Sequence, residues 1–352
     1  KNVAVLGSGV MGAGIACHLA NIGMNVVMLD IIPFDLSESE KNEKSSGNRI
    51  ADSSLVKAIK SKPAALYKSD FSNRIKTGNF EDDFEKISDA DWVLEVVIEK
   101  LEIKKQIFEK VEKYRKKGSI ITSNTSSIPI EMLVEGRSDD FKINFCGTHF
   151  FNPPRYLRLL EIIPHKESDP EMIEYFMKFG ELFLGKQTVL CKDTPAFIAN
   201  RLGVMSSMKI LELTKEMDFK IEEVDALTGP IIGRPNTGTF RLQDLVGIDT
   251  GENVSKFVRA TVKNDEFVDS FKNIPTPKYI DFLIENNFLG NETKKGFYEK
   301  TNLKDEKGKT IIKALNLESL KYETSIRPNL DILKKAKSIE NFGKRLKLLI
   351  EG

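Results

Sequence analysis

The chain has 352 residues with a formal net charge of +1, and 40% of its residues are hydrophobic. This length allows two domains with buried cores, and the near-zero charge argues against a general polyanion-binding protein. Three cysteines without a CxxC pair indicate reduced thiols in a cytoplasmic protein, and neither a disulfide framework nor a metal site is expected. The apolar segment 2–20 is not expected to be a signal peptide or a membrane span, because four glycines interrupt it. No other stretch is suited to cross a membrane.

The first 30 residues have the pattern of a strand, a glycine-rich loop, a helix and a second strand. Residues 3–6 are a short apolar run, as a buried parallel strand requires, and the glycines follow at once. Residues 13–22 have helical spacing and end near Gly23, and residues 25–30 form a second apolar run that ends in an aspartate. We therefore expect a βαβ unit.

Strands and helices continue to alternate up to residue 192. Residues 37–68 are a polar, Lys-rich insertion with helical spacing over 55–66, which Pro63 interrupts. The further strands are expected at 92–98, 119–122, 142–150 and 188–190, and a helix is expected at 100–113. This alternation predicts an α/β domain over 1–192, with a Rossmann-type, doubly wound and mostly parallel sheet.

The character of the sequence changes after residue 192. Asp193 or Thr194 is a suitable N-cap and Pro195 fits a first helical turn, so we expect one helix over 195–216. Further helices and loops predict a mainly α-helical second domain at 193–300. Residues 301–352 carry 12 Lys and Arg against 7 Asp and Glu. We expect a basic C-terminal extension there, with an amphipathic helix over 330–350.

The glycines after the first strand form a GxGxxG pattern. In dinucleotide-binding folds the first glycine permits a tight turn, the second lets the pyrophosphate approach, and the third allows close packing of the helix. The helix N-terminus then offers free N–H groups to the phosphates. A glycine turn in a non-binding α/β protein is the alternative. The loop residues expected at the cofactor are Gly7, Gly9, Val10, Met11 and Gly12.

Asp30 ends the second strand, 23 positions after Gly7. An acidic residue there accepts hydrogen bonds from the ribose hydroxyls of the adenosine half. Its charge would repel a 2′-phosphate, so the sequence favours NAD over NADP.

Only three histidines are present, and they differ in context. His18 lies on the first helix and fits a packed or partly exposed helical residue, whereas His165 follows Pro164 in a polar loop and fits a surface role. His149 lies at the end of an apolar strand, where ligands of open α/β sheets bind and where a histidine can accept a proton. A core histidine with satisfied hydrogen bonds is the alternative for His149.

Three further polar residues stand in positions that require a partner. Glu161 is flanked by apolar residues, so it needs an imidazolium, an arginine or backbone N–H groups. Ser126 follows a strand and fits either a site or a turn. Asn200 interrupts an apolar helical stretch, which indicates a specific partner that could also be structural.

Together these motifs resemble the L-3-hydroxyacyl-CoA dehydrogenases of fatty-acid β-oxidation, and especially the dehydrogenase part of long prokaryotic fatty-oxidation proteins. The resemblance covers roughly residues 1–300 in the family order, and no hydratase-like segment is present. The matching stretches are GSGVMGAGIA from Gly7, EVVIE from Glu95, SNTSS from Ser123, GTHFFNPP from Gly147, LLEII from Leu159, KDTPAFIANR from Lys192 and KKGFY from Lys294.

The resemblance implies NAD-dependent oxidation of an (S)-3-hydroxyacyl-CoA to a 3-ketoacyl-CoA. His149 would act as the general base and Glu161 would orient it. Ser126 and Asn200 would hydrogen-bond the substrate. A homodimer formed through the helical domain, and a fused or associated enoyl-CoA hydratase, are further implications.

The same resemblance assigns several binding residues. Glu99, Lys104 and Asn124 match positions near the nicotinamide half of the cofactor. Ser54, Lys60 and Lys62 match the region that meets the phosphates of the CoA substrate, although a solvated helix face explains these lysines equally well.

Some positions depart from the family pattern. Glu292 stands where family members often have a lysine, so a cofactor contact there is not expected, and Lys294 or Lys295 could replace it. Segment 31–50 aligns poorly. The basic extension could bind CoA, pack on the helical domain or lead into another domain. Its few interleaved aromatic residues argue against nucleic-acid binding. An NAD dehydrogenase of free hydroxy or sugar acids and a non-catalytic NAD-binding module are the alternative functions.

Overall fold

The computed structural model describes residues 1–40 and 43–351. The chain forms two compact units, Lys1–Ile198 and the part that begins at Ala199. Each unit has its own buried apolar core. In the described part of the chain, no helix has the length and apolar character needed to cross a bilayer.

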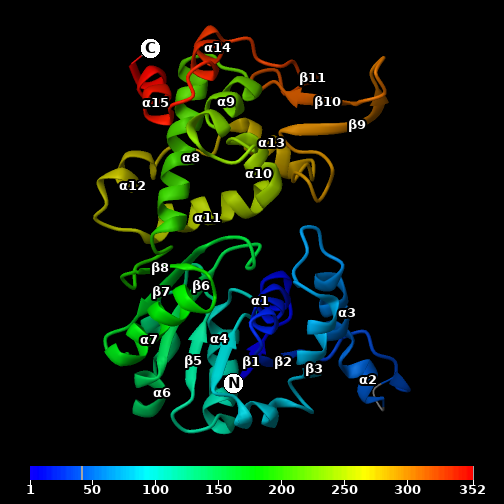
Figure 1. Cartoon of the computed structure of the whole chain (residues 1–352), viewed down its shortest axis with the longest axis vertical. Helices are drawn as coiled ribbons and strands as arrows, with labels where there is room; N and C mark the ends of the chain where they lie inside the picture. The colour runs from blue at the N-terminus through cyan, green and yellow to red at the C-terminus, as the bar shows by residue number, and fades with distance from the viewer. Residues whose placement is uncertain (41–42, 352) are drawn as a thin grey trace. The chain divides into compact units, whose positions relative to one another are not determined.

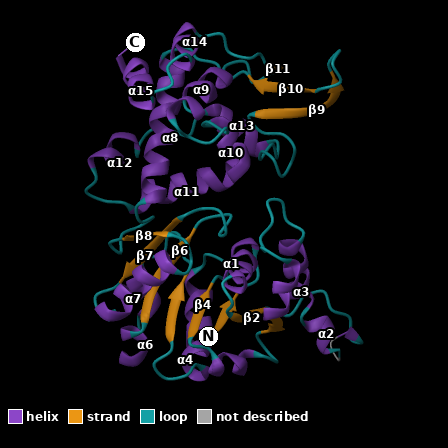
Figure 2. Ribbon diagram, viewed as in Figure 1, coloured by secondary structure: helices purple, strands orange, loops and turns teal. Residues whose placement is uncertain are grey.

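An eight-stranded sheet in the order β3-β2-β1-β4-β5-β6-β7-β8 forms the centre of the first unit (Figure 2). Strands β1 to β6 run parallel to one another, β7 is antiparallel to β6, and β8 is parallel to β7. The strands are β1 (Asn2–Leu6), β2 (Asn25–Asp30), β3 (Ile75–Asn79), β4 (Trp92–Glu95), β5 (Ile120–Ser123), β6 (Phe145–Phe150), β7 (Leu159–Pro164) and β8 (Gln187–Leu190).

Helices cover both faces of this sheet. Alternate residues of β1 point to opposite faces, so Val3 and Val5 join one apolar cluster, while Ala4 and Leu6 join the other. Burial on both faces explains the continuous apolar runs of these strands. The first cluster is completed by α1 (Val10–Asn21), α3 (Arg49–Ile59) and α7 (Pro170–Leu182), and the second by α4 (Leu101–Tyr114), α5 (Ile130–Val134) and α6 (Asp139–Ile143).

The predicted fold class is confirmed, but several predicted elements were wrong in detail. Strand β3 was not predicted, because its largely polar sequence IKTGN lacks an apolar period; it pairs with β2. Strand β7 was not predicted either. The insertion helix was predicted at 55–66 but spans Arg49–Ile59 and is preceded by α2 (Lys44–Gly47). The helix predicted from residue 195 begins only at Ala199, because Ala196 and Phe197 have left-handed backbone conformations.

The second unit is mainly helical (Figure 1). Phe240, Leu283 and Phe297 are fully buried at its centre. Its helices up to residue 285 are α8 (Ala199–Glu216), α9 (Ile221–Leu227), α10 (Phe240–Val246), α11 (Ile248–Thr261), α12 (Glu266–Phe271) and α13 (Lys278–Glu285).

The C-terminal extension differs from its prediction. Strands β9 (Tyr298–Lys304), β10 (Thr310–Leu315) and β11 (Tyr322–Thr324) form an antiparallel sheet that the sequence analysis did not predict. The single helix expected at 330–350 is instead two helices, α14 (Asp331–Lys337) and α15 (Phe342–Glu351). Their apolar residues pack against the turn around Ile231, so the extension packs on the helical domain.

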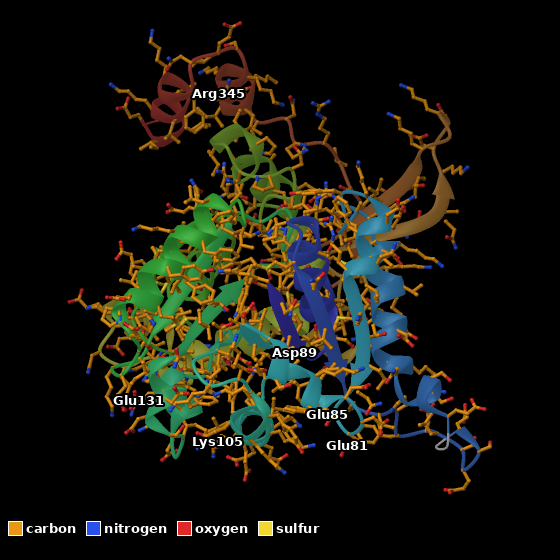
Figure 3. All side chains as sticks on the ribbon, turned by 60° about the horizontal axis from the view of Figure 1, so that its bottom comes forward. Glu81, Glu85, Asp89, Lys105, Glu131 and Arg345 are labelled. Carbon is orange, nitrogen blue, oxygen red and sulfur yellow. The ribbon has the colours of Figure 1, made fainter. Side chains whose placement is uncertain are left out.

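Charged side chains lie on the surface of both units. Figure 3 labels Glu81, Glu85 and Asp89 in the connection between β3 and β4, and Arg345 on α15. The three carboxylates are exposed to solvent. Arg345 instead donates to the carbonyl of Ile339, which joins the end of α14 to α15.

Candidate functional site

The glycine loop is closely packed at Gly7 and Gly12 and open at Gly9. Gly7 has a φ of +104°, and a Cβ there would lie 2.6 Å from the carbonyl oxygen of Val96. A Cβ on Gly12 would overlap the carbonyl oxygen of Gly7. At Gly9, no described atom lies within 4 Å of the corresponding position. The backbone at Gly9 is therefore open to a ligand, as a bound pyrophosphate requires.

Helix α1 begins directly after this open glycine. The N–H of Ala13 donates to the carbonyl of Gly9 (2.9 Å). The N–H groups of Val10, Met11 and Gly12 precede this bond and make no bond within the helix. Three N–H groups at the positive end of a helix fit the phosphates of a dinucleotide.

Asp30 lies at the carboxyl end of β2, beside the same loop. Its Oδ2 accepts hydrogen bonds from the N–H and hydroxyl of Ser8, both at 2.6 Å, and its Oδ1 accepts from the N–H of Ile31 at 2.7 Å. An ionised carboxylate has further lone pairs for the ribose hydroxyls. The residues present therefore fit NAD.

His149 and Glu161 form a buried pair. They lie directly opposite each other in the antiparallel register of β6 and β7. The Nδ1 atom of His149 lies 2.6 Å from Oε2 of Glu161, and both residues are buried. With Nδ1–H bonded to the carboxylate, the other ring nitrogen, Nε2, is the atom that can exchange a proton with a substrate.

Two aromatic rings enclose the imidazole of His149. The ring centroid of Phe151 lies 4.3 Å from that of His149, and the centroid of Phe197 lies 6.0 Å from it. Packing of this kind holds the imidazole in one orientation.

The other carboxylate oxygen of Glu161 is also engaged. Its Oε1 accepts the N–H of Ile198 at 3.1 Å. Burial, and then the charge of Glu161, raise the pKa of the neighbouring Cys191 thiol to about 12. A neutral thiol and a backbone N–H therefore surround the carboxylate, while His149 is the ionisable group on Oε2.

Glu99 organises the loop that contains Ser126. Its Oε1 accepts the hydroxyl of Thr125 (2.6 Å) and the N–H groups of Ser126 (2.8 Å) and Ser127 (3.0 Å). Burial raises the pKa of Glu99, but Lys104 and these hydrogen bonds outweigh it and lower the pKa overall. Glu99 is therefore a charged anchor for the serine loop.

Lys104 forms an ion pair with Glu99 from the buried side of the site. Its ammonium is 2.7 Å from Glu95 and 3.2 Å from Glu99, and only 1% of its side chain is exposed. The hydroxyl of Ser123 also donates to Glu95 (2.5 Å). Because Lys104 is enclosed, its influence on a cofactor would act through Glu99. Neither Glu95 nor Ser123 was predicted as a site residue, although Glu95 begins the EVVIE motif and Ser123 begins the SNTSS motif.

Asn124 connects the serine loop to the strand of His149. Its Oδ1 accepts the N–H of Phe150 at 2.9 Å. This bond joins the ends of β5 and β6, so the first unit brings together Glu99, Asn124, Ser126, His149 and Glu161 at adjacent strand ends.

The residues assigned to CoA lie elsewhere on the first unit. Ser54 is half-buried on α3, Lys60 is the C-cap of α3, and Lys62 follows in the loop. Both lysines are exposed and have no ion pair among the described residues. Asn200, by contrast, lies in the first turn of α8 and belongs to the second unit.

The other two histidines have structural partners. The Nε2 of His18 lies 3.0 Å from the carbonyl of Leu184, and burial lowers the pKa of His18 to about 4. His165 was expected at the surface, but it is buried and its Nε2 lies 2.9 Å from the carbonyl of Lys142. Its place beside Pro164, the end of β7, explains this burial.

Residues of the KKGFY motif form stabilising contacts within the second unit. The N–H groups of Phe297 and Tyr298 donate to Asp244 at 2.7 and 2.9 Å. Lys295 pairs with Glu299 at 3.1 Å and lies over two aromatic rings, so its ammonium is already used within this unit.

The fold and the site together define a class of protein. A parallel sheet with an open glycine loop, an acidic residue at the end of β2 and a buried histidine–carboxylate pair is the arrangement of a Rossmann-fold dehydrogenase.

Family comparison narrows this class. The model of the 3-hydroxyacyl-CoA dehydrogenase NAD binding domain matches residues 2–194, and the model of the C-terminal domain of the same family matches residues 197–300. The chain therefore belongs to the 3-hydroxyacyl-CoA dehydrogenase family, as its motifs predicted.

Individual relatives agree with this assignment. A probable 3-hydroxyacyl-CoA dehydrogenase of Bacillus subtilis is 44% identical over 99% of this chain and 44% of its own length. A putative fatty acid oxidation complex trifunctional enzyme of Rickettsia felis is 39% identical over 92% of this chain and 43% of its own length. The chain thus spans less than half of each of these relatives.

A solved structure shows the same architecture. The (S)-3-hydroxybutyryl-CoA dehydrogenase PaaH1 of Ralstonia eutropha has a TM-score of 0.65 and is 27% identical, and the match covers 84% of this chain and 97% of that chain.

Proposed function

We propose that this protein oxidises (S)-3-hydroxyacyl-CoA thioesters to 3-ketoacyl-CoA with NAD, and catalyses the reverse reaction. The observation that carries the proposal is the 2.6 Å contact between His149 and Glu161, in the unit that holds the open glycine loop. Such a pair can move a proton at a hydroxyl, and the bound nicotinamide supplies the hydride acceptor for C3.

His149 is the general base in this mechanism. Its Nε2 takes the proton of the 3-hydroxyl as the C3 hydrogen leaves as hydride. Its Nδ1–H remains on Glu161, and the negative carboxylate stabilises the imidazolium. In the reverse direction the imidazolium returns the proton to the 3-keto oxygen.

The other site residues bind and orient. We assign hydrogen bonds to the substrate to Ser126 and Asn200, and contacts with the nicotinamide half of the cofactor to Asn124 and to Glu99, supported by Lys104. We assign the phosphates of the CoA portion to Ser54, Lys60 and Lys62. Lys60 and Lys62 are exposed and form no ion pair with any residue that the structure describes, which supports this assignment, because phosphate binding needs free cations.

The test is NADH consumption with acetoacetyl-CoA, measured beside free acetoacetate and beside NADPH. We expect turnover with the thioester and NADH, and little with either alternative. Equal turnover of free acetoacetate would favour a dehydrogenase of free hydroxy acids. His149→Gln should abolish turnover while leaving NADH binding intact, and wild-type turnover in this variant would contradict the mechanism.

The proposed function also includes an oligomeric state, a cellular location and a partner enzyme. We propose a homodimer in the cytoplasm, which light scattering and cell fractionation test. Because a trifunctional relative is more than twice as long as this chain, we also propose an enoyl-CoA hydratase partner, fused or associated. Hydratase activity that copurifies with the protein from its native source tests this association.

A further inference from the structure

The turn between β8 and α8 has an unusual backbone. Ala196 and Phe197 have φ values of +63° and +47°, although neither is glycine, and each is only 1% exposed. Two consecutive residues of this kind rarely adopt left-handed conformations, which persist only where the surrounding structure holds them. Such conformations are concentrated at functional sites, so the contacts of this turn are informative.

Contacts on both sides hold the turn in place. Asp193, just before it, accepts the N–H groups of Ile130 (2.7 Å) and Glu131 (2.8 Å) at the start of α5. The N–H of Phe197 donates to the carbonyl of Thr194 at 3.0 Å, and the Phe197 ring is buried in the apolar cluster beneath α5. The turn is therefore determined by contacts with the surrounding structure and not by the conformational propensity of its own residues.

The same turn makes two contacts with the histidine–carboxylate pair. The N–H of Ile198 donates to Oε1 of Glu161 at 3.1 Å. The ring of Phe197 lies against His149, with centroids 6.0 Å apart. If the helix had started at residue 195, as its sequence suggested, the N–H of Ile198 would lie in the first helical turn instead of on this carboxylate.

We propose that Phe197 and the backbone N–H of Ile198 are positioning groups for the reaction of His149. With Oε2 on His149 and Oε1 on Ile198, both oxygens of Glu161 are fixed, so the carboxylate cannot rotate away from the imidazole. Phe197 closes one side of the imidazole against water and against tilting. The expected effect on kcat rests on the proposed function. The expected effect on the orientation of the His149 ring does not depend on that function.

The decisive comparison is Phe197→Leu against Phe141→Leu. Both phenylalanines are fully buried in the same apolar cluster, and both variants remove a ring. Phe141, however, lies on α6, and its ring packs on Phe108 and Phe145, with centroids 5.7 and 5.4 Å away. Loss of packing alone should affect both variants equally. Ala196→Gly is a second control, because glycine adopts the left-handed conformation freely.

Two readouts separate positioning from general stability. We expect Phe197→Leu to lower kcat with acetoacetyl-CoA about tenfold, with the KM for substrate and for NADH within about twofold, because a small displacement of a catalytic group costs rate. The second readout is the NMR signal of the Nδ1 proton of His149 in protein with ¹⁵N-labelled histidine. With three histidines in the chain, His149→Gln identifies this signal. It should be sharp in the wild type, Phe141→Leu and Ala196→Gly, and broadened by exchange in Phe197→Leu.

The proposal is overturned if Phe197→Leu keeps the wild-type kcat and a sharp signal, or if Phe141→Leu loses as much of both. If Phe197→Leu does not fold, Ala196→Val replaces it, because a β-branched residue opposes the left-handed turn that positions Phe197, while Phe197 and His149 themselves are not substituted. A wild-type protein without activity on acetoacetyl-CoA would contradict the proposed function alone. The proton signal would then still decide this inference.

Discussion

The ammonium of Lys104 lies between two carboxylates, 2.7 Å from Glu95 and 3.2 Å from Glu99, with 1% of its side chain exposed. Lys104 therefore connects the buried Glu95 to Glu99, whose carboxylate binds the serine loop. Burial raises the pKa of Glu95, and Lys104 opposes this effect. Removal of the cation would leave Glu95 buried without its counter-charge.

Lys104→Met should therefore destabilise the protein strongly. Breaking a buried ion pair from one side costs about 3–5 kcal/mol, because the remaining charge stays desolvated. Urea unfolding measures this loss. The control is Lys105→Met, since Lys105 pairs with Glu135 at the surface and should contribute at most about 1 kcal/mol. Equal losses in the two variants would show that the buried pair has no special importance.

Glu161→Gln should reduce catalysis without changing binding. The amide keeps the shape of the side chain but cannot compensate the charge of the imidazolium, so kcat should fall by about 100-fold or more. KM values for acetoacetyl-CoA and NADH should stay near those of the wild type. Glu167→Gln is the control, because Glu167 lies in a loop after β7 away from His149. A Glu161→Gln variant with a raised KM and normal kcat would indicate a binding role instead.

The sequence predicted those parts of the site whose residues are recognisable from their immediate neighbours in the chain. The glycine pattern with Asp30 marks the nucleotide loop because its parts are close in sequence and have separate steric reasons. His149 and Glu161 were each identified from their apolar surroundings. Their pairing depends on the antiparallel register of β6 and β7, however, and β7 was not assigned.

The remaining features depend on contacts between distant parts of the chain. Asp193 or Thr194 was expected to cap the helix that follows. The carboxylate of Asp193 instead accepts the N–H of Ile130 at the start of α5, 63 positions earlier in the chain. Without that capping role, and with a left-handed turn at Ala196 and Phe197, the helix starts later. Neither alanine nor phenylalanine has a sequence preference for such a turn. The strand β3 was missed for a similar reason, since pairing with β2 determines it.

Asp30→Ala should weaken the preference for NADH over NADPH. The variant loses an acceptor for the ribose hydroxyls and removes a charge that repels a 2′-phosphate. A hydrogen bond to a charged group contributes about 1.5–3 kcal/mol, so the ratio of kcat/KM for the two cofactors should shift by roughly 10- to 100-fold. Asp35→Ala, in the following loop, is the control and should leave the ratio unchanged. An unchanged ratio in Asp30→Ala would remove Asp30 from the cofactor site.

Asp244 should make the stability of the second unit depend on pH in an unusual direction. Burial raises the pKa of Asp244 from 3.8 to about 6, although the N–H groups of Phe297 and Tyr298 favour its charged form. Between these two values the folded protein binds more protons at this group than the unfolded chain does. The contribution of Asp244 to stability is therefore fully present below about pH 4 and decreases as the pH rises to about 6.

Urea unfolding of the wild type and of Asp244→Asn between pH 4 and 7 measures this effect. Below about pH 4 the variant should be less stable than the wild type, because a single amide oxygen replaces the two oxygens that accept from Phe297 and Tyr298. The stability advantage of the wild type should decrease by up to about 3 kcal/mol as the pH rises, because each pKa unit corresponds to about 1.4 kcal/mol. Asp281→Asn, on α13, controls for the general effect of losing a carboxylate. An advantage that grows with pH would mean that hydrogen bonding to the charged form outweighs burial at Asp244.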